Sequence, residues 1–198
     1  PCHIVLLART DKGRKAINKI LSIANKDGYY ARPRIDIELI DQLPYDDVMI
    51  TTACVAFWNK YDDIGDIVRH LAESFPHFYL EVQAHDTPEQ KELNRRIIQI
   101  SEELLVPIIA GCDSHVITES QILDRDELLK SGNIHYEDED GWYMDYPTYD
   151  VLFERFKQQG VLTDGQIKSA INNTNVLFEF EDIKLDRSLK VPVIKELR

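Results

Sequence analysis

Asp113 and His115 stand two residues apart, directly after the short apolar run 107–110, and Cys112 precedes them. Side chains spaced in this way point to the same side of an extended backbone. A carboxylate and an imidazole on one side suit Zn²⁺, Mn²⁺ or Fe²⁺, and a nearby thiolate shifts the preference toward zinc. The spacing therefore permits a metal site, although an aspartate after a strand is also typical of a turn or a helix cap.

A second candidate ligand, Cys54, follows another apolar run at residues 48–53. Parallel strands of an α/β fold collect their functional groups at their C-terminal ends, so Cys54 and the group after residue 111 are expected at one edge of a sheet. The alternative is that Cys54 and Cys112 are small buried apolar side chains, as free cysteines often are.

Arg32 and Arg34 flank Pro33 in a segment expected to be extended. Two forked guanidinium groups suit a phosphate. The alternative is a surface pair neutralised by nearby acids such as Asp36 and Glu38. The chain has no glycine-rich phosphate loop, nucleophile elbow or zinc-finger pairing.

The remaining histidines and one strand carboxylate carry weaker expectations. We expect His70 on a helix surface, His77 in a turn, His85 in a solvated loop after a strand and His135 exposed in an acidic loop. Glu81 lies inside a strand, where a salt bridge to a neighbouring strand competes with a catalytic role.

Elements that would position these residues alternate along the first part of the chain. Apolar runs at 3–8, 48–53, 78–82 and 106–111 predict strands, and residues 12–26, 37–43, 62–75 and 88–105 have helical patterns. Thr10 or Asp11, Asp36, and Thr87 with Gln90 are suited to cap three of these helices. Alternation of this kind predicts parallel strands joined by helical crossovers.

The rest of the chain lacks this alternation of strands and helices. Helices are predicted over 118–130, over 148–160 with Gly160 as its stop, and from a capping box at Thr163 and Gln166 onward. The acidic and aromatic segment 135–147 is predicted to be a hairpin or an irregular loop. We therefore expect a barrel or sheet portion over 1–117, a helical appendage over 118–180 and an exit segment over 181–198.

Composition and charge limit the class of protein. The 198 residues are 43% hydrophobic and 29% charged, with a net charge of −12, which is ordinary for a globular protein but unfavourable for gripping DNA by broad electrostatics. No apolar run reaches membrane-spanning length. Three cysteines without paired spacing argue against a disulfide framework and favour a reducing cytoplasm.

Three segments resemble one known family in collinear order. They are "HIVLLARTDKGRKAINKILSIANKDGYYARPRID", "FYLEVQAHDTPEQKELNRRIIQISEELLVPIIAGCDSHVI" and "INNTNVLFEFEDIKL". They resemble the PHP (polymerase and histidinol phosphatase) domain at the front of the alpha subunit of bacterial DNA polymerase III. The resemblance is weak over 119–162. It implies an α/β fold, a distorted (β/α)₇ TIM-like barrel that is partial here, with a helical appendage at its C-terminal side.

The resemblance also implies a metal cluster of up to three divalent ions, Zn, Mn or Fe, at the C-terminal ends of the strands. Matched by motif, His3, Cys54, Asp113 and His115 stand at ligand positions, whereas Cys112 and His85 do not. The family's His-x-His, a further His or Asp and a glutamate have no counterpart. Because the chain begins at Pro1 almost directly with a strand, we expect those ligands upstream of it.

The function implied for the intact domain is a metal-dependent phosphoesterase, a 3′→5′ proofreading exonuclease in DNA replication. One alternative is a non-catalytic scaffold that supports the polymerase and partner subunits, and another is a free-standing phosphatase of the histidinol-phosphatase type. The implied partners are the polymerase core of the same polypeptide, a DNA 3′ end and other replication subunits, with no membrane. We expect the chain alone to be inactive.

Overall fold

A computed structural model describes residues 3–58, 64–134, 136 and 141–188. The longer strands are β1 (Val5–Ala8), β4 (Val48–Thr51), β5 (Phe78–Gln83) and β6 (Ile108–Gly111), and β2 (Tyr29–Tyr30) and β3 (Arg32–Pro33) form a small hairpin. The helices are α1 (Asp11–Lys26), α2 (Ile37–Ile40), α3 (Val55–Trp58), α4 (Ile64–Ser74), α5 (Pro88–Leu104), α6 (Ile122–Ser131), α7 (Tyr149–Gln159) and α8 (Asp164–Asn173). Short 3₁₀ turns, η1 (Glu119–Gln121) and η2 (Thr174–Glu179), precede α6 and follow α8.

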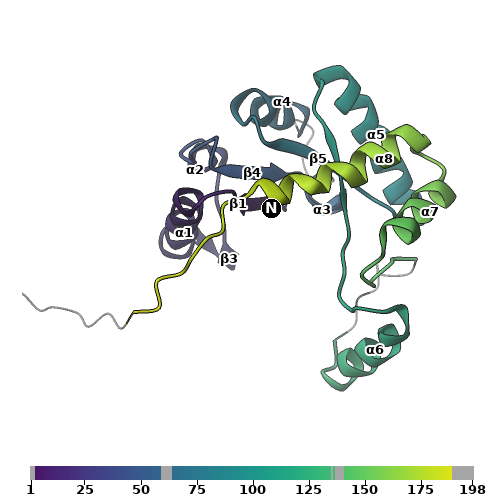
Figure 1. The fold of residues 1–198 in the computed structure, drawn as a ribbon. Coiled ribbons are helices and arrows are strands. Elements are labelled where there is room, and N and C mark those ends of the chain that lie inside the picture. Colours follow the sequence, from purple (N-terminus) through teal and green to yellow (C-terminus); the bar gives the residue numbers. More distant parts are fainter. Residues whose placement is uncertain (1–2, 59–63, 135, 137–140, 189–198) are drawn as a thin grey trace, which may run out of the picture.

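The four longer strands form a mixed sheet in the order β1-β4-β5-β6 (Figure 1). β4, β5 and β6 are parallel, as predicted, but β1 pairs antiparallel with β4, with Val5 opposite Thr51 and Ala8 opposite Val48. The prediction of an all-parallel set is therefore wrong for β1. The long connection between β1 and β4 leaves the end of β1 and returns beside it to start β4, since the Arg9 N–H donates to the Asp47 carbonyl at 2.9 Å.

Strand lengths also differ from the sequence expectations. β1 begins at Val5 and is half-buried along its whole length, whereas a buried strand over 3–8 was expected. β4 is fully buried but ends at Thr51, and Ala53 just after it adopts a left-handed backbone with φ 52°. The described part of the chain is thus an open α/β sheet.

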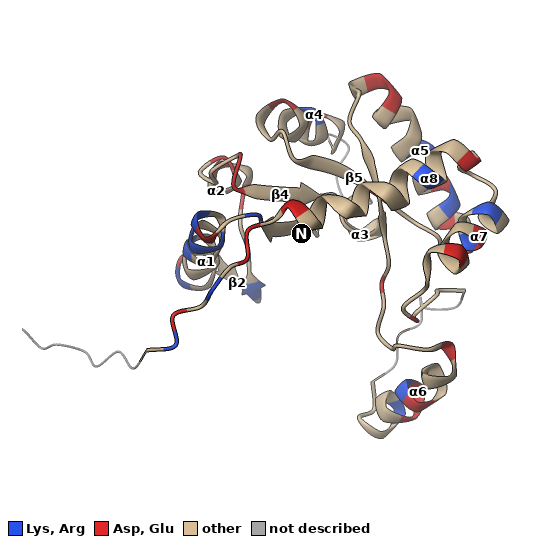
Figure 2. Cartoon of the chain, viewed as in Figure 1, with Lys and Arg blue, Asp and Glu red and all other residues tan. Residues whose placement is uncertain are grey.

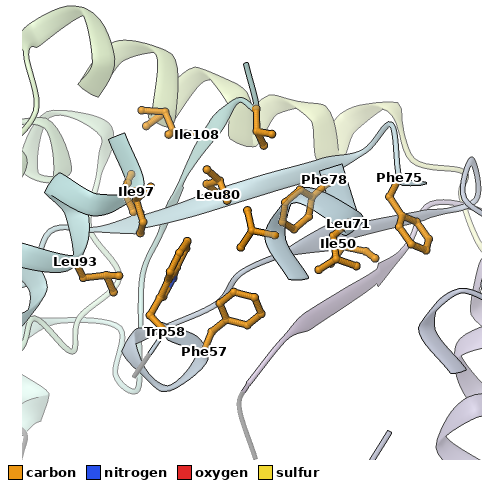
Figure 3. Close-up of a cluster of buried hydrophobic side chains, with 14 of the residues drawn as sticks. Ile50, Phe57, Trp58, Leu71, Phe75, Phe78, Leu80, Leu93, Ile97 and Ile108 are labelled. Atoms are coloured by element: carbon orange, nitrogen blue, oxygen red, sulfur yellow. The ribbon is translucent and has the colours of Figure 1, made fainter. Parts of the chain in front are cut away.

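One face of the sheet packs on helices to form the main core (Figure 3). Ile50 and Leu80 from β4 and β5 are fully buried against Phe57 and Trp58 of α3 and against Ile97 of α5. Phe57 and Trp58 meet edge to face, with ring centroids 5.3 Å apart. Burial of such side chains contributes about 1.5–3 kcal/mol each, so this core fixes the strand ends that carry the candidate ligands.

Local signals place most helix ends correctly. Thr10, Asp36 and Thr163 each accept a hydrogen bond from a backbone N–H of the first helical turn, and Thr163 with Gln166 forms the predicted capping box. At Thr87 the box is incomplete: the Thr87 side chain accepts from the Gln90 N–H, but the Gln90 side chain turns to donate to Asn94, and its oxygen accepts no hydrogen bond from the described residues. Gly160 ends α7 in a left-handed conformation at φ 72°, as predicted.

The C-terminal helices divide into two groups. α7 and α8 supply Leu152, Phe156, Ile167 and Ala170 to the same core, and α8 lies along β6. α6 projects away from the sheet and buries no side chain (Figure 1). Trp142–Pro147 is irregular, as the sequence allowed, whereas positions 62–63, 135, 137–140 and 189–198 of the predicted segments lie outside the described residues. Across the part of the chain that is described, no helix is both long and apolar enough to cross a membrane.

Candidate metal-binding site

His3 and Cys54 meet at one edge of the sheet. Because β1 runs antiparallel to β4, the start of β1 lies beside the end of β4, where Cys54 follows. The Nδ1 atom of His3 lies 3.5 Å from Sγ of Cys54. In an all-parallel sheet His3 would lie at the opposite edge, so the reversed strand is what brings the pair together.

Asp113 and His115 form a second pair after β6. His115 Nε2 lies 3.3 Å from an Asp113 carboxylate oxygen, and both side chains are partly exposed. The loop is held from outside, since the His115 N–H donates to the Met144 carbonyl at 2.7 Å and the Ser114 hydroxyl donates to the Asp145 carbonyl at 2.9 Å. The Asp-x-His spacing thus places both groups on one side of a fixed loop.

His85 follows β5, the strand between β4 and β6, and it is buried, with 3% of its surface exposed. The prediction of a solvated loop is wrong because Trp142 stacks on the imidazole with centroids 4.6 Å apart. The Tyr143 N–H donates to Nδ1 at 3.0 Å, which leaves the proton of a neutral ring on Nε2. Burial lowers the pKa of His85 to about 4, opposed by the negative charge of Asp113 and reinforced by Arg155. Nε2 has no hydrogen-bond partner among the described residues.

A network of buried amides fixes the end of β5. Asn94 of α5 donates to the Gln83 carbonyl at 2.8 Å and to the Gln159 side chain at 2.7 Å. Gln159 of α7 donates in turn to the carbonyls of Gln83 and His85, at 3.0 and 2.7 Å. These bonds replace water at buried backbone groups, so two helices hold the strand exit in one position.

Glu81 lies on the polar side of β5 and is bound by its neighbours. Its carboxylate accepts from the Thr51 hydroxyl at 2.8 Å and from the Gln83 amide at 2.9 Å. A Cβ atom at Gly111 would lie 2.0 Å from the same carboxylate, so any side chain on β6 at this point requires Glu81 to move. Glu81 is thus held by one hydrogen bond from the neighbouring strand and one from its own strand, and it forms no salt bridge with the described residues, although the sequence suggested one as a possibility.

Asp145 and Arg155 are structural residues that sequence reasoning missed. Arg155 donates to both carboxylate oxygens of Asp145, at 2.7 and 2.9 Å, and its guanidinium lies 4.1 Å from the centroid of Tyr143. Both side chains are nearly buried. A signal was present, because Trp142, Met144 and Tyr143 are large side chains that a solvated acidic loop does not need.

The two ligand pairs do not join into one cluster. β5 separates them, and strands about 4.8 Å apart place the exits of β4 and β6 about 10 Å from each other. Within the described residues there is no group of three or more His, Cys, Asp or Glu side chains suited to one metal ion. Cys112 is exposed as a residue, but local desolvation, with Glu81 nearby, raises the pKa of its thiol to about 11, which disfavours the thiolate that binds metals.

Arg32 and Arg34 lie away from these pairs, on β3 and just after it. Neither forms an ion pair with Asp36 or Glu38, so that alternative is not what the structure contains. Instead, the Arg34 guanidinium lies 4.8 Å from the ring centroid of Tyr30.

Comparison with known proteins points to one class, DNA polymerase III subunits. The chain is 27% identical over 198 residues to DNA polymerase III subunit alpha of Aquifex aeolicus, a match covering 91% of this chain and 16% of that protein. It is 30% identical over 138 residues to the protein of the same name from Borreliella burgdorferi, covering 66% of this chain and 12% of the relative. DNA polymerase III PolC-type of Clostridium perfringens is 30% identical over 131 residues, covering 58% and 9%.

Most of the chain is therefore related to a region of DNA polymerase III subunit alpha. The chain spans between 9% and 16% of the length of these three relatives. No family model matches the chain.

Proposed function

We propose that this chain is part of a PHP-type, metal-dependent phosphoesterase domain in a DNA polymerase III alpha-like polypeptide. In this proposal the intact domain removes nucleotides from a DNA 3′ end during replication in the cytoplasm, next to the polymerase core and other replication subunits. The open sheet is then one section of a distorted barrel. The observation that carries the proposal is the meeting of His3 with Cys54 at the sheet edge where Asp113 and His115 also lie.

The distances within both pairs fit shared metal ions. Two tetrahedral zinc ligands, one sulfur and one imidazole nitrogen, stand about 3.6 Å apart when calculated from ordinary zinc–ligand bond lengths. The observed His3–Cys54 distance is 3.5 Å. A carboxylate oxygen and an imidazole nitrogen on one zinc stand about 3.4 Å apart, and Asp113 and His115 lie 3.3 Å apart.

His3 and Cys54 would hold one ion in this domain, and Asp113 with His115 another. When bound, such ions supply an activated water and neutralise charge on the scissile phosphate. The chain's own contribution is positional, because the Met144 carbonyl and the buried amide network keep the strand exits fixed without any metal. Further ligands outside the described residues are needed to complete each coordination sphere.

The test uses the full polypeptide that carries this chain. Bound metal is measured by elemental mass spectrometry, and degradation of a 3′-labelled oligonucleotide is followed with Mn²⁺ or Zn²⁺. We expect bound metal and nuclease activity, and we expect Asp113→Asn to reduce both, while Asp86→Asn, at an exposed carboxylate paired with Lys91, leaves both unchanged. A full-length protein that binds no metal contradicts the proposal.

A scaffold role is the second candidate, and a specific observation favours it. Asp113 and His115 partner each other, and no group of three or more metal-binding side chains exists among the described residues. In that case the double variant Asp113→Ala/His115→Ala lowers the thermal stability of the polypeptide, and the unmodified protein has no nuclease activity to lose.

A further inference from the structure

Positive charge is concentrated in the first part of this acidic chain. Residues 1–34 contain eight Lys and Arg against two Asp, a formal charge of +6, whereas the whole chain carries −12. In Figure 2, the blue ribbon segments that mark Lys and Arg positions lie along α1 and on the β2–β3 hairpin. A local basic surface on an acidic protein attracts anions only where it is exposed, so its shape indicates which anions it fits.

On α1 the lysines lie along one face. Lys12, Lys15, Lys19 and Lys26 are spaced at helical intervals and are all exposed. The residues that α1 buries, Gly13, Ile20 and Ala24, belong to another face, which contacts the sheet. The lysine face therefore forms a row that faces solvent.

The hairpin after α1 adds aromatic rings and guanidinium groups. Tyr30 pairs with Arg32 across a turn at Ala31, whose φ is 58°. Tyr29 and Tyr30 are 61% and 73% exposed, which is unusual for such large rings. Arg34 lies over the ring of Tyr30 at 4.8 Å and Arg32 pairs with Tyr30, so this side of the hairpin presents a cationic and aromatic platform, whereas Tyr29, the neighbouring strand residue, belongs to the opposite side.

The hairpin is held against the end of α1. The Arg34 N–H donates to the Gly28 carbonyl at 3.2 Å. A Cβ atom at Gly28 would lie 2.3 Å from the Arg34 carbonyl oxygen, so only glycine permits this approach. The lysine row and the platform are thus parts of one rigid unit, which we call the basic unit, comprising α1 and residues 28–34.

Part of the charge is already neutralised and part is available. Lys12 pairs with Asp47, and Arg14 and Lys15 pair with Asp11. Lys19, Arg32 and Arg34 form no ion pair with the described residues, and Lys26 lies 3.9 Å from the exposed Asp27. The available cations lie on the half of the basic unit that includes the hairpin.

We propose that the basic unit binds single-stranded DNA, with Tyr30 stacking on a base and Lys19, Arg32 and Arg34 contacting phosphates. Exposed aromatic rings beside cations are the usual means of binding single strands without sequence preference, because every base offers a flat face. An acidic peptide would use the cations but not the rings, and a duplex hides its base faces. The choice of DNA over RNA rests on the proposed function.

Binding is measured by fluorescence anisotropy with labelled oligo(dT) at low salt and in EDTA, using the full polypeptide. EDTA separates this test from the proposed function, because binding to the basic unit needs no metal and no hydrolysis. We expect Arg32→Gln/Arg34→Gln to weaken binding and to reduce the slope of log affinity against log salt by about 1.4. The control is Lys157→Gln/Lys168→Gln, which removes the same charge from exposed positions on α7 and α8 and should leave the slope unchanged.

A second variant tests the rings. Tyr30→Leu is expected to weaken binding about tenfold, as loss of one stacked base does. Because Tyr30 is exposed, the substitution should not unfold the protein, and weaker binding then reports the loss of the ring. The proposal is overturned if the arginine variant binds like its control or if Tyr30→Leu has no effect. It is also overturned if duplex DNA binds as tightly as the single strand or if RNA binds more tightly than DNA. Displacement of the oligonucleotide by polyglutamate at equal charge would overturn it as well.

Discussion

The Nδ1 atom of His3 lies 3.5 Å from Sγ of Cys54, across the antiparallel pairing of β1 with β4. A thiol–imidazole hydrogen bond and a shared metal ion both fit this distance. The two explanations differ in what they require of the sulfur, because a metal ligand is a thiolate and a hydrogen-bonding thiol need not be one.

Cobalt substitution distinguishes them. If Cys54 is a ligand, Co²⁺ bound to the full polypeptide shows a thiolate charge-transfer band, and Cys54→Ser abolishes it. Cys112→Ser keeps the band, since the raised pKa of Cys112 disfavours its thiolate. If the band survives Cys54→Ser, or if Cys112→Ser removes it, Cys54 is not the sulfur ligand.

A side chain at Gly111 is predicted to destabilise the protein. In Gly111→Ala the new methyl group meets the Glu81 carboxylate at 2.0 Å, so Glu81 must leave Thr51 and Gln83. We expect a loss of about 1–3 kcal/mol in the free energy of unfolding, measured by urea denaturation.

Gly165→Ala is the matched control for this substitution. Gly165 lies in the first turn of α8, and nothing stands within 4 Å of a Cβ atom there. Alanine favours a helix over glycine by up to about 1 kcal/mol, so the control should be neutral or stabilising. Equal destabilisation by both substitutions would show that the contact with Glu81 does not decide the cost.

What the sequence predicted correctly is mostly local. Thr10, Asp36 and Thr163 cap helices through bonds to the residue three positions later, and such signals are contained in the sequence itself. The exits of β4 and β6 were also predictable, because apolar runs end there. The direction of β1 was not, since it depends on where a connection with two helices and a hairpin returns the chain.

The surroundings of His85 were equally inaccessible to sequence reasoning. Its loop was predicted to be solvated because it follows a strand, but Trp142 and Tyr143, more than 50 positions later, cover it. Arg32 and Arg34 show the opposite case: nearby acids suggested ion pairs, and packing placed Arg34 on Tyr30 instead. The contacts of His85 are long-range and override local preference, whereas the contact of Arg34 with Tyr30 depends on the fold of one short hairpin.

The ion pair between Asp145 and Arg155 is predicted to be costly to break from one side. Both side chains are nearly buried, so Asp145→Ala leaves a guanidinium without its partner, and we expect a loss of about 3–5 kcal/mol by urea denaturation. Replacing both, as Asp145→Ala/Arg155→Met, should recover part of that loss. Glu127→Ala, which breaks the exposed pair with Lys130, should cost no more than about 1 kcal/mol.

An effect of Asp145→Ala as small as that of Glu127→Ala would show that Arg155 finds another partner or reaches water. A double variant less stable than Asp145→Ala would show that packing of Arg155 on Tyr143 matters more than its charge. Either result would change which contact holds the loop that carries Asp113 and His115.

His85 is predicted to make stability depend on pH. Burial lowers its pKa in the folded protein to about 4 from an ordinary value of 6.5, so between these values the unfolded chain binds more protons than the folded one. The free energy of unfolding therefore falls as the pH falls from 6.5 toward 4, by up to about 3 kcal/mol, and the contribution is fully present above pH 6.5. Urea denaturation across this pH range, in EDTA, measures it.

Two variants assign that dependence to one residue. His85→Asn has no group that titrates in the range and keeps an acceptor for the Tyr143 N–H, so its stability should lose most of the slope between pH 4 and 6.5. His70→Gln changes an exposed histidine paired with Asp41 and should keep the slope. If His85→Asn and the unmodified protein lose stability in parallel on acidification, the burial of a neutral His85 is not the cause, and the carboxylates of the fold must be examined instead.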